Sequence, residues 1–126
     1  MKTLMAVALG GALGSVARHG VVAWAGDRLG LDFPWGTLIV NLIGSFAIGA
    51  LAEAMTLLWS PSPEIRAFLI VGILGGFTTY SAFSLDIFVL IERGAWIPAL
   101  SYVLASLLLG LGGLVAGLRL VRLVAG

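Results

Sequence analysis

The amide side chain of Asn41 lies in the middle of a long apolar stretch of the sequence. A polar group in hydrocarbon is costly and is expected to have a partner or a function. The amide carries two N–H donors and one carbonyl acceptor. Asn41 is therefore either a hydrogen-bond partner between helices or a donor that replaces water around a dehydrated anion, and the sequence leaves both interpretations open.

A second group of polar residues directly follows a group of glycines. Gly72, Gly75 and Gly76 lead into the run Thr78-Thr79-Tyr80-Ser81. Glycine and β-branched residues are poor helix formers, and serine and threonine hydroxyls can satisfy backbone groups where a membrane helix is interrupted. We therefore expect a broken helix here, with free carbonyls that could hold a small cation, as broken helices do in transporters.

Two aromatic residues, Tyr80 and Phe83, are three positions apart and so lie near one face of a helix. The edges of aromatic rings are electropositive, so this pair could face an anion edge-on. The same spacing is typical of aromatic residues that pack in a helical core. Spacing alone favours core packing.

The first apolar stretch contains two polar residues, Arg18 and His19. Arg18 is either an anchor that reaches the membrane interface, a partner for a carboxylate such as Glu53 or Asp86, or a charge that attracts an anion. His19 is expected to be interfacial, since the chain has no second histidine to share a metal. With no cysteine and no Ser-His-Asp arrangement, we expect no enzyme chemistry.

The composition indicates what kind of scaffold holds these residues. The chain has 126 residues, of which 60% are hydrophobic and 10% are charged, with a net charge of +1. So few charges cannot cover the surface of a soluble domain, and the near-neutral charge argues against a nucleic-acid partner. An integral membrane protein remains.

Four apolar stretches are long enough to cross a bilayer, which takes about 20 residues. They run over residues 3–25, 36–59, 65–91 and 95–118. None of them alternates as the strands of a membrane barrel do, so we expect one all-α domain over residues 1–126. The start of the chain also resembles a cleavable signal peptide, but cleavage would remove a glycine pattern that is typical of helix packing.

Lys and Arg give little preference for one orientation in the membrane. One side holds Lys2, Arg66, Arg119 and Arg122, and the other holds Arg28 and Arg93, with Arg18 if its side chain extends there. This balance fits insertion in both orientations. Glycines four apart favour close helix packing in membranes, and they occur at Gly10 and Gly14, Gly72 and Gly76, and Gly113 and Gly117. We expect a homodimer.

Three motifs together resemble those of the CrcB/Fluc family of fluoride channels. They are Gly10-Gly11-Ala12-Leu13-Gly14 with Arg18, then Gly36-Thr37-Leu38-Ile39-Val40-Asn41-Leu42-Ile43-Gly44-Ser45-Phe46, and then Gly75-Gly76-Phe77-Thr78-Thr79-Tyr80-Ser81-Ala82-Phe83-Ser84. The motifs occur in the order that the family has. The length and the four-span layout are similar as well.

The resemblance implies an antiparallel, dual-topology homodimer in the inner membrane of a bacterium, with two pores per dimer. It would conduct fluoride passively out of the cell and so confer fluoride resistance. The implied ion pathway contains Asn41, Thr37, Ser81, Phe83, Tyr80 and Arg18. The backbone carbonyls of Gly75 and Thr78 from both subunits would hold a structural sodium ion.

Two positions depart from the family pattern: Tyr80 replaces a usual phenylalanine, and Ala82 replaces a common threonine. They affect the expected ion coordination and rate, not the family assignment. The alternative function is proton-coupled export of cationic compounds by a small multidrug-type transporter. Such transporters use a carboxylate in the first span, where this chain has only Arg18.

Overall fold

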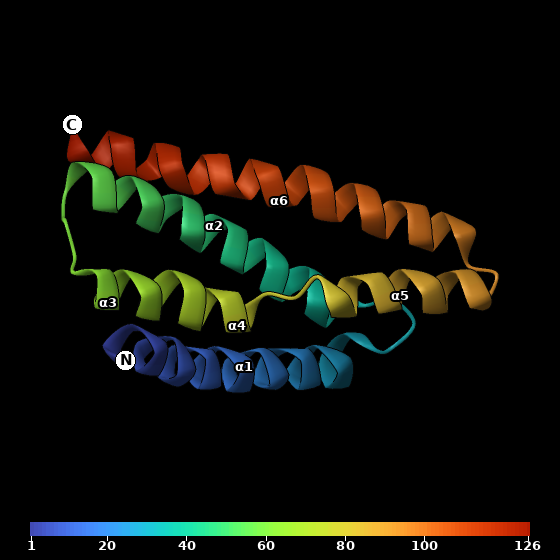
Figure 1. Cartoon of the computed structure of the whole chain (residues 1–126). Helices are drawn as coiled ribbons and strands as arrows, with labels where there is room; N and C mark the ends of the chain where they lie inside the picture. Colours follow the sequence, from blue (N-terminus) through green and yellow to red (C-terminus); the bar gives the residue numbers. More distant parts are fainter.

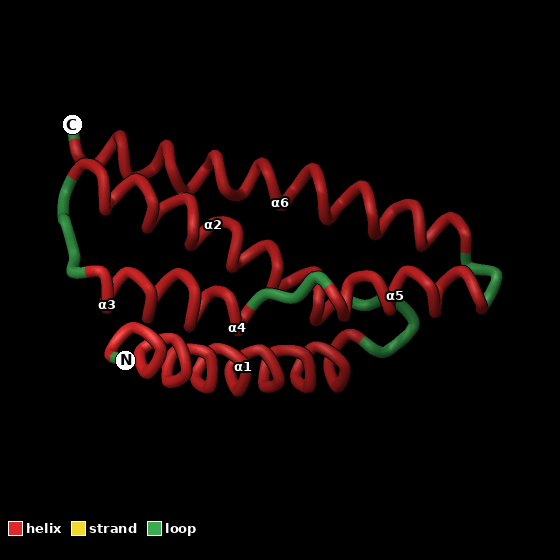
Figure 2. Tube along the Cα trace, viewed as in Figure 1, coloured by secondary structure: helices red, strands yellow, loops and turns green.

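A computed structural model describes residues 1–126 and is entirely helical apart from the connections (Figures 1 and 2). Helices α1 (Lys2–Leu29), α2 (Trp35–Leu57) and α6 (Trp96–Ala125) are continuous. The third span consists of α3 (Pro63–Arg66), the π-helix η1 (Ala67–Leu74), α4 (Gly75–Phe77) and α5 (Ser81–Glu92). All four spans are long and apolar enough to cross a membrane. The prediction of an all-α membrane protein with a broken third helix is confirmed.

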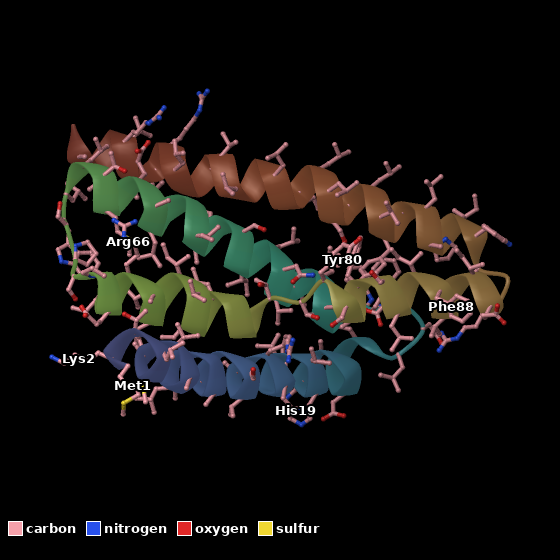
Figure 3. All side chains as sticks on the ribbon, in the orientation of Figure 1. Met1, Lys2, His19, Arg66, Tyr80 and Phe88 are labelled. Carbon is pink, nitrogen blue, oxygen red and sulfur yellow. The ribbon has the colours of Figure 1, made fainter.

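The helices pack as two pairs. Helices α2 and α6 make the most extensive contact in the molecule, and α1 packs along η1 and α4 (Figure 1). Both chain termini and the α2–α3 connection lie at the same end (Figure 1), and the labelled side chains of Lys2 and Arg66 are at this end (Figure 3). Between the two pairs the contacts of α2 with η1 and α4 are sparse, so the subunit is open along this line.

Glycine allows the close approach within each pair. A Cβ atom on Gly10 of α1 would lie 2.5 Å from the carbonyl oxygen of Phe68, and one on Gly76 would lie 2.7 Å from that of Gly11. In the other pair, a Cβ on Gly117 would lie 3.0 Å from the backbone N of Ala50. Small residues thus bring the helix backbones together inside the subunit, as membrane packing requires.

The third span changes its hydrogen-bonding pattern before it breaks. At the end of η1 the Gly75 N–H reaches the carbonyl of Ile70, five residues back, which is the wide turn of a π-helix. The chain then becomes extended at Thr78, with ψ 162°, and re-enters a helix at Ser81. The break was predicted from the sequence, but the π-helix was not.

The two carboxylates inside the spans, Glu53 and Asp86, do not pair with Arg18 but with residues of α6. Glu53, a buried residue of α2, forms an ion pair with Arg122 near the end of α6. Asp86 accepts a hydrogen bond from the hydroxyl of Tyr102 at 3.0 Å. The interpretation of Arg18 as a partner of Glu53 or Asp86 is therefore wrong within the subunit, because other helices supply both partners.

Candidate functional site

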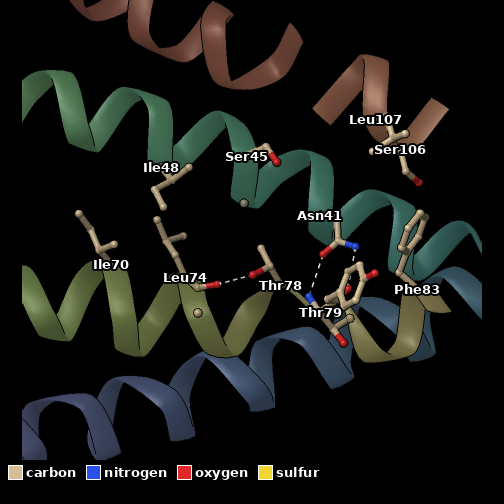
Figure 4. Close-up of a pocket in the computed structure, with 13 residues that line it drawn as sticks. Asn41, Ser45, Ile48, Ile70, Leu74, Thr78, Thr79, Phe83, Ser106 and Leu107 are labelled. Carbon is tan, nitrogen blue, oxygen red and sulfur yellow. Dashed lines mark hydrogen bonds between the residues drawn. The ribbon is translucent and has the colours of Figure 1, made fainter. Parts of the chain in front are cut away.

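A groove of about 430 Å³ lies where the two helix pairs diverge, beside the break in the third span (Figure 4). Its polar residues come from α2, the break, and α6: Asn41, Ser45, Thr78, Thr79, Tyr80 and Ser106. Its apolar wall includes Ile48, Ile70, Leu74, Phe83 and Leu107. A polar strip along an otherwise apolar groove in a membrane protein is typical of an ion or substrate pathway.

Asn41 binds the backbone of the break at two points (Figure 4). The Thr79 N–H donates to Asn41 Oδ1 at 2.8 Å, and Asn41 Nδ2 donates to the Thr79 carbonyl at 3.0 Å. One of the two N–H groups of the amide is thus engaged, and the second remains available where Asn41 lines the groove. Asn41 is an interhelical hydrogen-bond partner, and it still has one donor for a ligand.

Hydroxyl groups satisfy other backbone groups at the break. Thr78 Oγ1 donates to the Leu74 carbonyl at 2.9 Å. Thr79 Oγ1 accepts from the Ala82 N–H at 3.1 Å and lies 3.3 Å from Ser81 Oγ. Such hydrogen bonds satisfy some of the backbone groups that lose their helical partners where a membrane helix is interrupted.

The same hydrogen bonds leave two carbonyls without their helical donors. In a continuous helix, Gly75 O would accept from the Thr79 N–H and Thr78 O from the Ala82 N–H. Those two N–H groups instead bond to Asn41 and to the Thr79 hydroxyl. The carbonyls of Gly75 and Thr78, which both belong to residues lining the groove, are therefore free to act as hard oxygen ligands.

The two predicted aromatic residues have different environments. Phe83 packs against the buried cluster that contains Leu38, Leu90 and Tyr102, with its ring centroid 5.1 Å from that of Tyr102. The Tyr80 side chain is 80% exposed on the isolated subunit, and its ring lies 6.2 Å from Phe83. Phe83 thus packs on the core side, as its spacing favoured, and it also lines the groove.

Three predicted pathway residues do not line the groove of the single subunit. Thr37 is buried within the subunit, Ser81 is exposed at the start of α5, and Arg18 is half-buried on α1. Asn41, Tyr80 and Phe83 do line it, together with Gly75 and Thr78. A complete pathway that includes all of the predicted residues would need more than the groove of one subunit.

The structure adds polar residues of α6 that the sequence analysis missed. Ser106 lines the groove, and its hydroxyl is buried without a hydrogen-bond partner. Tyr102, one turn earlier, is fully buried and donates to Asp86. A signal was present, because two polar residues four apart share one face of the fourth span.

The family model described as CrcB-like protein, Camphor Resistance (CrcB), matches residues 5–118 of the chain. The protein is a member of this CrcB family. It is 56% identical to the fluoride-specific ion channel FluC of Rhodospirillum centenum over 97% of each chain. It is 57% identical to the protein of that name from Chelativorans sp., over 97% of this chain and 98% of the other. It is 50% identical to the fluoride-specific ion channel FluC of Nitrobacter winogradskyi, over 96% of each chain.

Membership of the CrcB family confirms the resemblance that the three motifs predicted. The matched residues include all four spans almost completely. Asn41, the break at residues 78–80 and Phe83 all lie within the match. The site described above therefore belongs to the part of the chain that defines the family.

Proposed function

We propose that this CrcB family member is a fluoride-specific passive ion channel, not an enzyme, that lets fluoride leave the cytoplasm of a bacterium across its inner membrane. One observation carries the proposal: 50–57% identity, over nearly the whole length, to proteins named fluoride-specific ion channel FluC. The groove beside Asn41 is the part of the subunit whose chemistry fits this activity.

The groove offers donors that can replace the water around fluoride. These are the second N–H of Asn41, the hydroxyls of Ser45 and Ser106, and the ring edge of Phe83. Fluoride is small and strongly hydrated, so a pathway must provide such donors and stay narrow enough to reject larger halides. Backbone contacts at glycine give the rigidity that this selection requires.

We infer that two copies assemble as an antiparallel, dual-topology dimer that contains two pores. The groove is open on the isolated subunit, Tyr80 beside it is 80% exposed, and Gly75 is exposed. A second copy placed on this face would close the groove and bring Thr37, Ser81 and Arg18 of the two subunits nearer a common path. Lys and Arg are nearly balanced between the two ends of the subunit, which is compatible with insertion of the two copies in opposite orientations in the membrane.

Sodium is the proposed structural ion of this dimer. The carbonyls of Gly75 and Thr78 lack helical donors, and two subunits would supply four hard oxygen ligands to one cation. The residues present therefore fit a small monovalent cation, which bound there would hold the two broken helices together. The protein contributes the two carbonyls of the helix break and the side chains of Asn41 and Thr79, which take the N–H groups that would otherwise bond to these carbonyls.

Replacing sodium by a large organic cation such as N-methyl-D-glucamine is expected to lower the thermal unfolding midpoint of the purified dimer. A site that is saturated about 100-fold above its Kd stabilises by about 2.7 kcal/mol. The midpoint can be followed by size-exclusion chromatography after heating. An identical midpoint in both cations would argue against a structural sodium ion.

Ser106→Ala is expected to slow fluoride efflux by several-fold up to about tenfold, since one hydrogen bond contributes about 1 kcal/mol. The stability of the fold should not fall, because the hydroxyl that is removed has no partner in the subunit. Ser101→Ala, an exposed position on the same helix, is the matched control and should leave efflux unchanged. Equal efflux rates for both variants would remove Ser106 from the pathway.

The channel is distinguished from a proton-coupled exporter of cationic compounds by its driving force. We expect fluoride efflux from proteoliposomes to proceed without a pH gradient and to be unaffected by collapsing one. The exporter alternative has no support in the first span, whose half-buried charge, Arg18, repels cations. Transport of an organic cation that depended on a pH gradient would favour it.

A further inference from the structure

We propose that Asn41 is also a positioning residue for the cation site, because its side-chain carbonyl holds the Thr79 N–H away from the Gly75 carbonyl and keeps that carbonyl free. The inference rests on the proposed sodium site. It concerns the acceptor end of the amide, whereas the proposed anion pathway uses its N–H donor. One side chain would then serve both ions.

The two hydrogen bonds between Asn41 and Thr79 fix the orientation of the amide. The Thr79 N–H donates to Oδ1 at 2.8 Å, and Nδ2 donates to the Thr79 carbonyl at 3.0 Å (Figure 4). A backbone N–H can only donate and a carbonyl can only accept, so turning the amide over would break both bonds. The acceptor end of Asn41 must therefore face the Thr79 N–H.

The α-helical hydrogen-bond pattern is interrupted at Thr79, whose N–H donates to Asn41. The Thr78 N–H still follows the α-helical pattern and donates to the Leu74 carbonyl at 3.0 Å. In the next position the pattern would join the Thr79 N–H to Gly75 O, but Asn41 Oδ1 accepts this hydrogen instead. Asn41 and the Gly75 carbonyl are thus competing acceptors for one donor.

Removing the Asn41 acceptor would leave the Thr79 N–H without a partner in a half-buried position between apolar helices. An unpaired backbone donor in such surroundings is costly. The smallest rearrangement that satisfies it is one more helical bond, from the Thr79 N–H to Gly75 O. That bond would occupy the carbonyl that the cation needs.

The second carbonyl of the site is released by Thr79 itself. Its hydroxyl accepts from the Ala82 N–H at 3.1 Å, so this donor does not reach Thr78 O. Thr79 therefore contributes to both carbonyls, but only the release of Gly75 depends on Asn41. This separation allows the role of Asn41 to be tested at a single hydrogen bond.

The test measures the rise in thermal unfolding midpoint of the purified dimer when N-methyl-D-glucamine is replaced by sodium. Asn41→Ala is expected to lose this sodium-dependent rise. Asn41→Asp is expected to keep it, because a carboxylate oxygen can still accept from the Thr79 N–H and leave Gly75 O free.

Two further variants serve as controls for the comparison of Asn41→Ala with Asn41→Asp. Asn41→Ala with Ser45→Asp adds the same charge to the groove but provides no acceptor for the Thr79 N–H, and it should not regain the sodium-dependent rise. Phe83→Leu should slow fluoride efflux and keep the rise in full, which shows that slow conduction alone does not remove the sodium response. The Asn41→Asp variant should still conduct poorly, because the Asn41 donor is absent.

A full sodium-dependent rise in Asn41→Ala would overturn the proposal, and so would loss of the rise in a folded Asn41→Asp dimer. An Asn41→Ala chain that forms no dimer counts as loss of the response, and the presence or absence of a sodium-dependent rise in the Asn41→Asp dimer then decides. A wild-type protein without any sodium response overturns both the sodium site and this inference. Its fluoride efflux would still stand as a separate result.

Discussion

Asn41→Asp is expected to reduce the rate of fluoride efflux by at least about 100-fold. The substitution preserves the size of the side chain but replaces the donor that lines the groove with an anionic oxygen. A fluoride ion that passes about 4 Å from a carboxylate is repelled by roughly 4 kcal/mol at an effective dielectric constant of about 20, and each 1.4 kcal/mol added to a barrier slows a rate tenfold. The rate is measured with a fluoride electrode on liposomes of equal protein content.

The dimer should survive Asn41→Asp, because one carboxylate oxygen still accepts from the Thr79 N–H, which lies 2.8 Å from the amide oxygen. Size-exclusion chromatography before and after reconstitution provides this control. A folded variant with an unchanged rate would show that fluoride does not pass Asn41, and the groove would lose its assignment as the pathway.

Gly14→Ala is expected to destabilise the fold by about 1–3 kcal/mol, the usual cost of overpacking. A Cβ at this position of α1 would overlap the carbonyl oxygen of Ile73 and lie 2.9 Å from the backbone N of Phe77. Both obstacles are backbone atoms, so no side-chain rotation relieves the contact. The added methyl would move α1 away from η1 and α4 and displace the break. The midpoint of thermal unfolding measures the effect.

Gly20→Ala is the matched control, on the same helix. A Cβ there meets no atom within 4 Å, and alanine is a better helix former than glycine by about 1 kcal/mol. This variant should therefore be as stable as the wild type or more stable. If both variants had the same midpoint, the contact at Gly14 would not hold the α1 pair together.

The sequence was sufficient to predict the parts of the fold that depend on local pattern. Four long apolar stretches predicted four spans, and the glycine–hydroxyl run predicted the break that the structure has between Phe77 and Ser81. The close packing at Gly10 and Gly14 follows from the small-residue spacing. These features need only the length of an element and the propensities of its residues.

Pairs of residues far apart in the chain could not be predicted in the same way. The partner of Asn41 is 38 positions away, and that of Glu53 is 69 positions away. Each pairing depends on how whole helices are placed side by side, which periodicity does not determine. The π-helix over Ala67–Leu74 was missed for a related reason, because a uniformly apolar run is compatible with either hydrogen-bonding pattern.

The central claim is tested most directly by comparing initial efflux rates of fluoride and chloride from liposomes that contain the purified dimer. A potassium ionophore balances the charge, and no pH gradient is applied. We expect fast fluoride efflux and chloride efflux no faster than from protein-free liposomes. A verified, folded dimer that released no fluoride, or released chloride as fast as fluoride, would contradict the account.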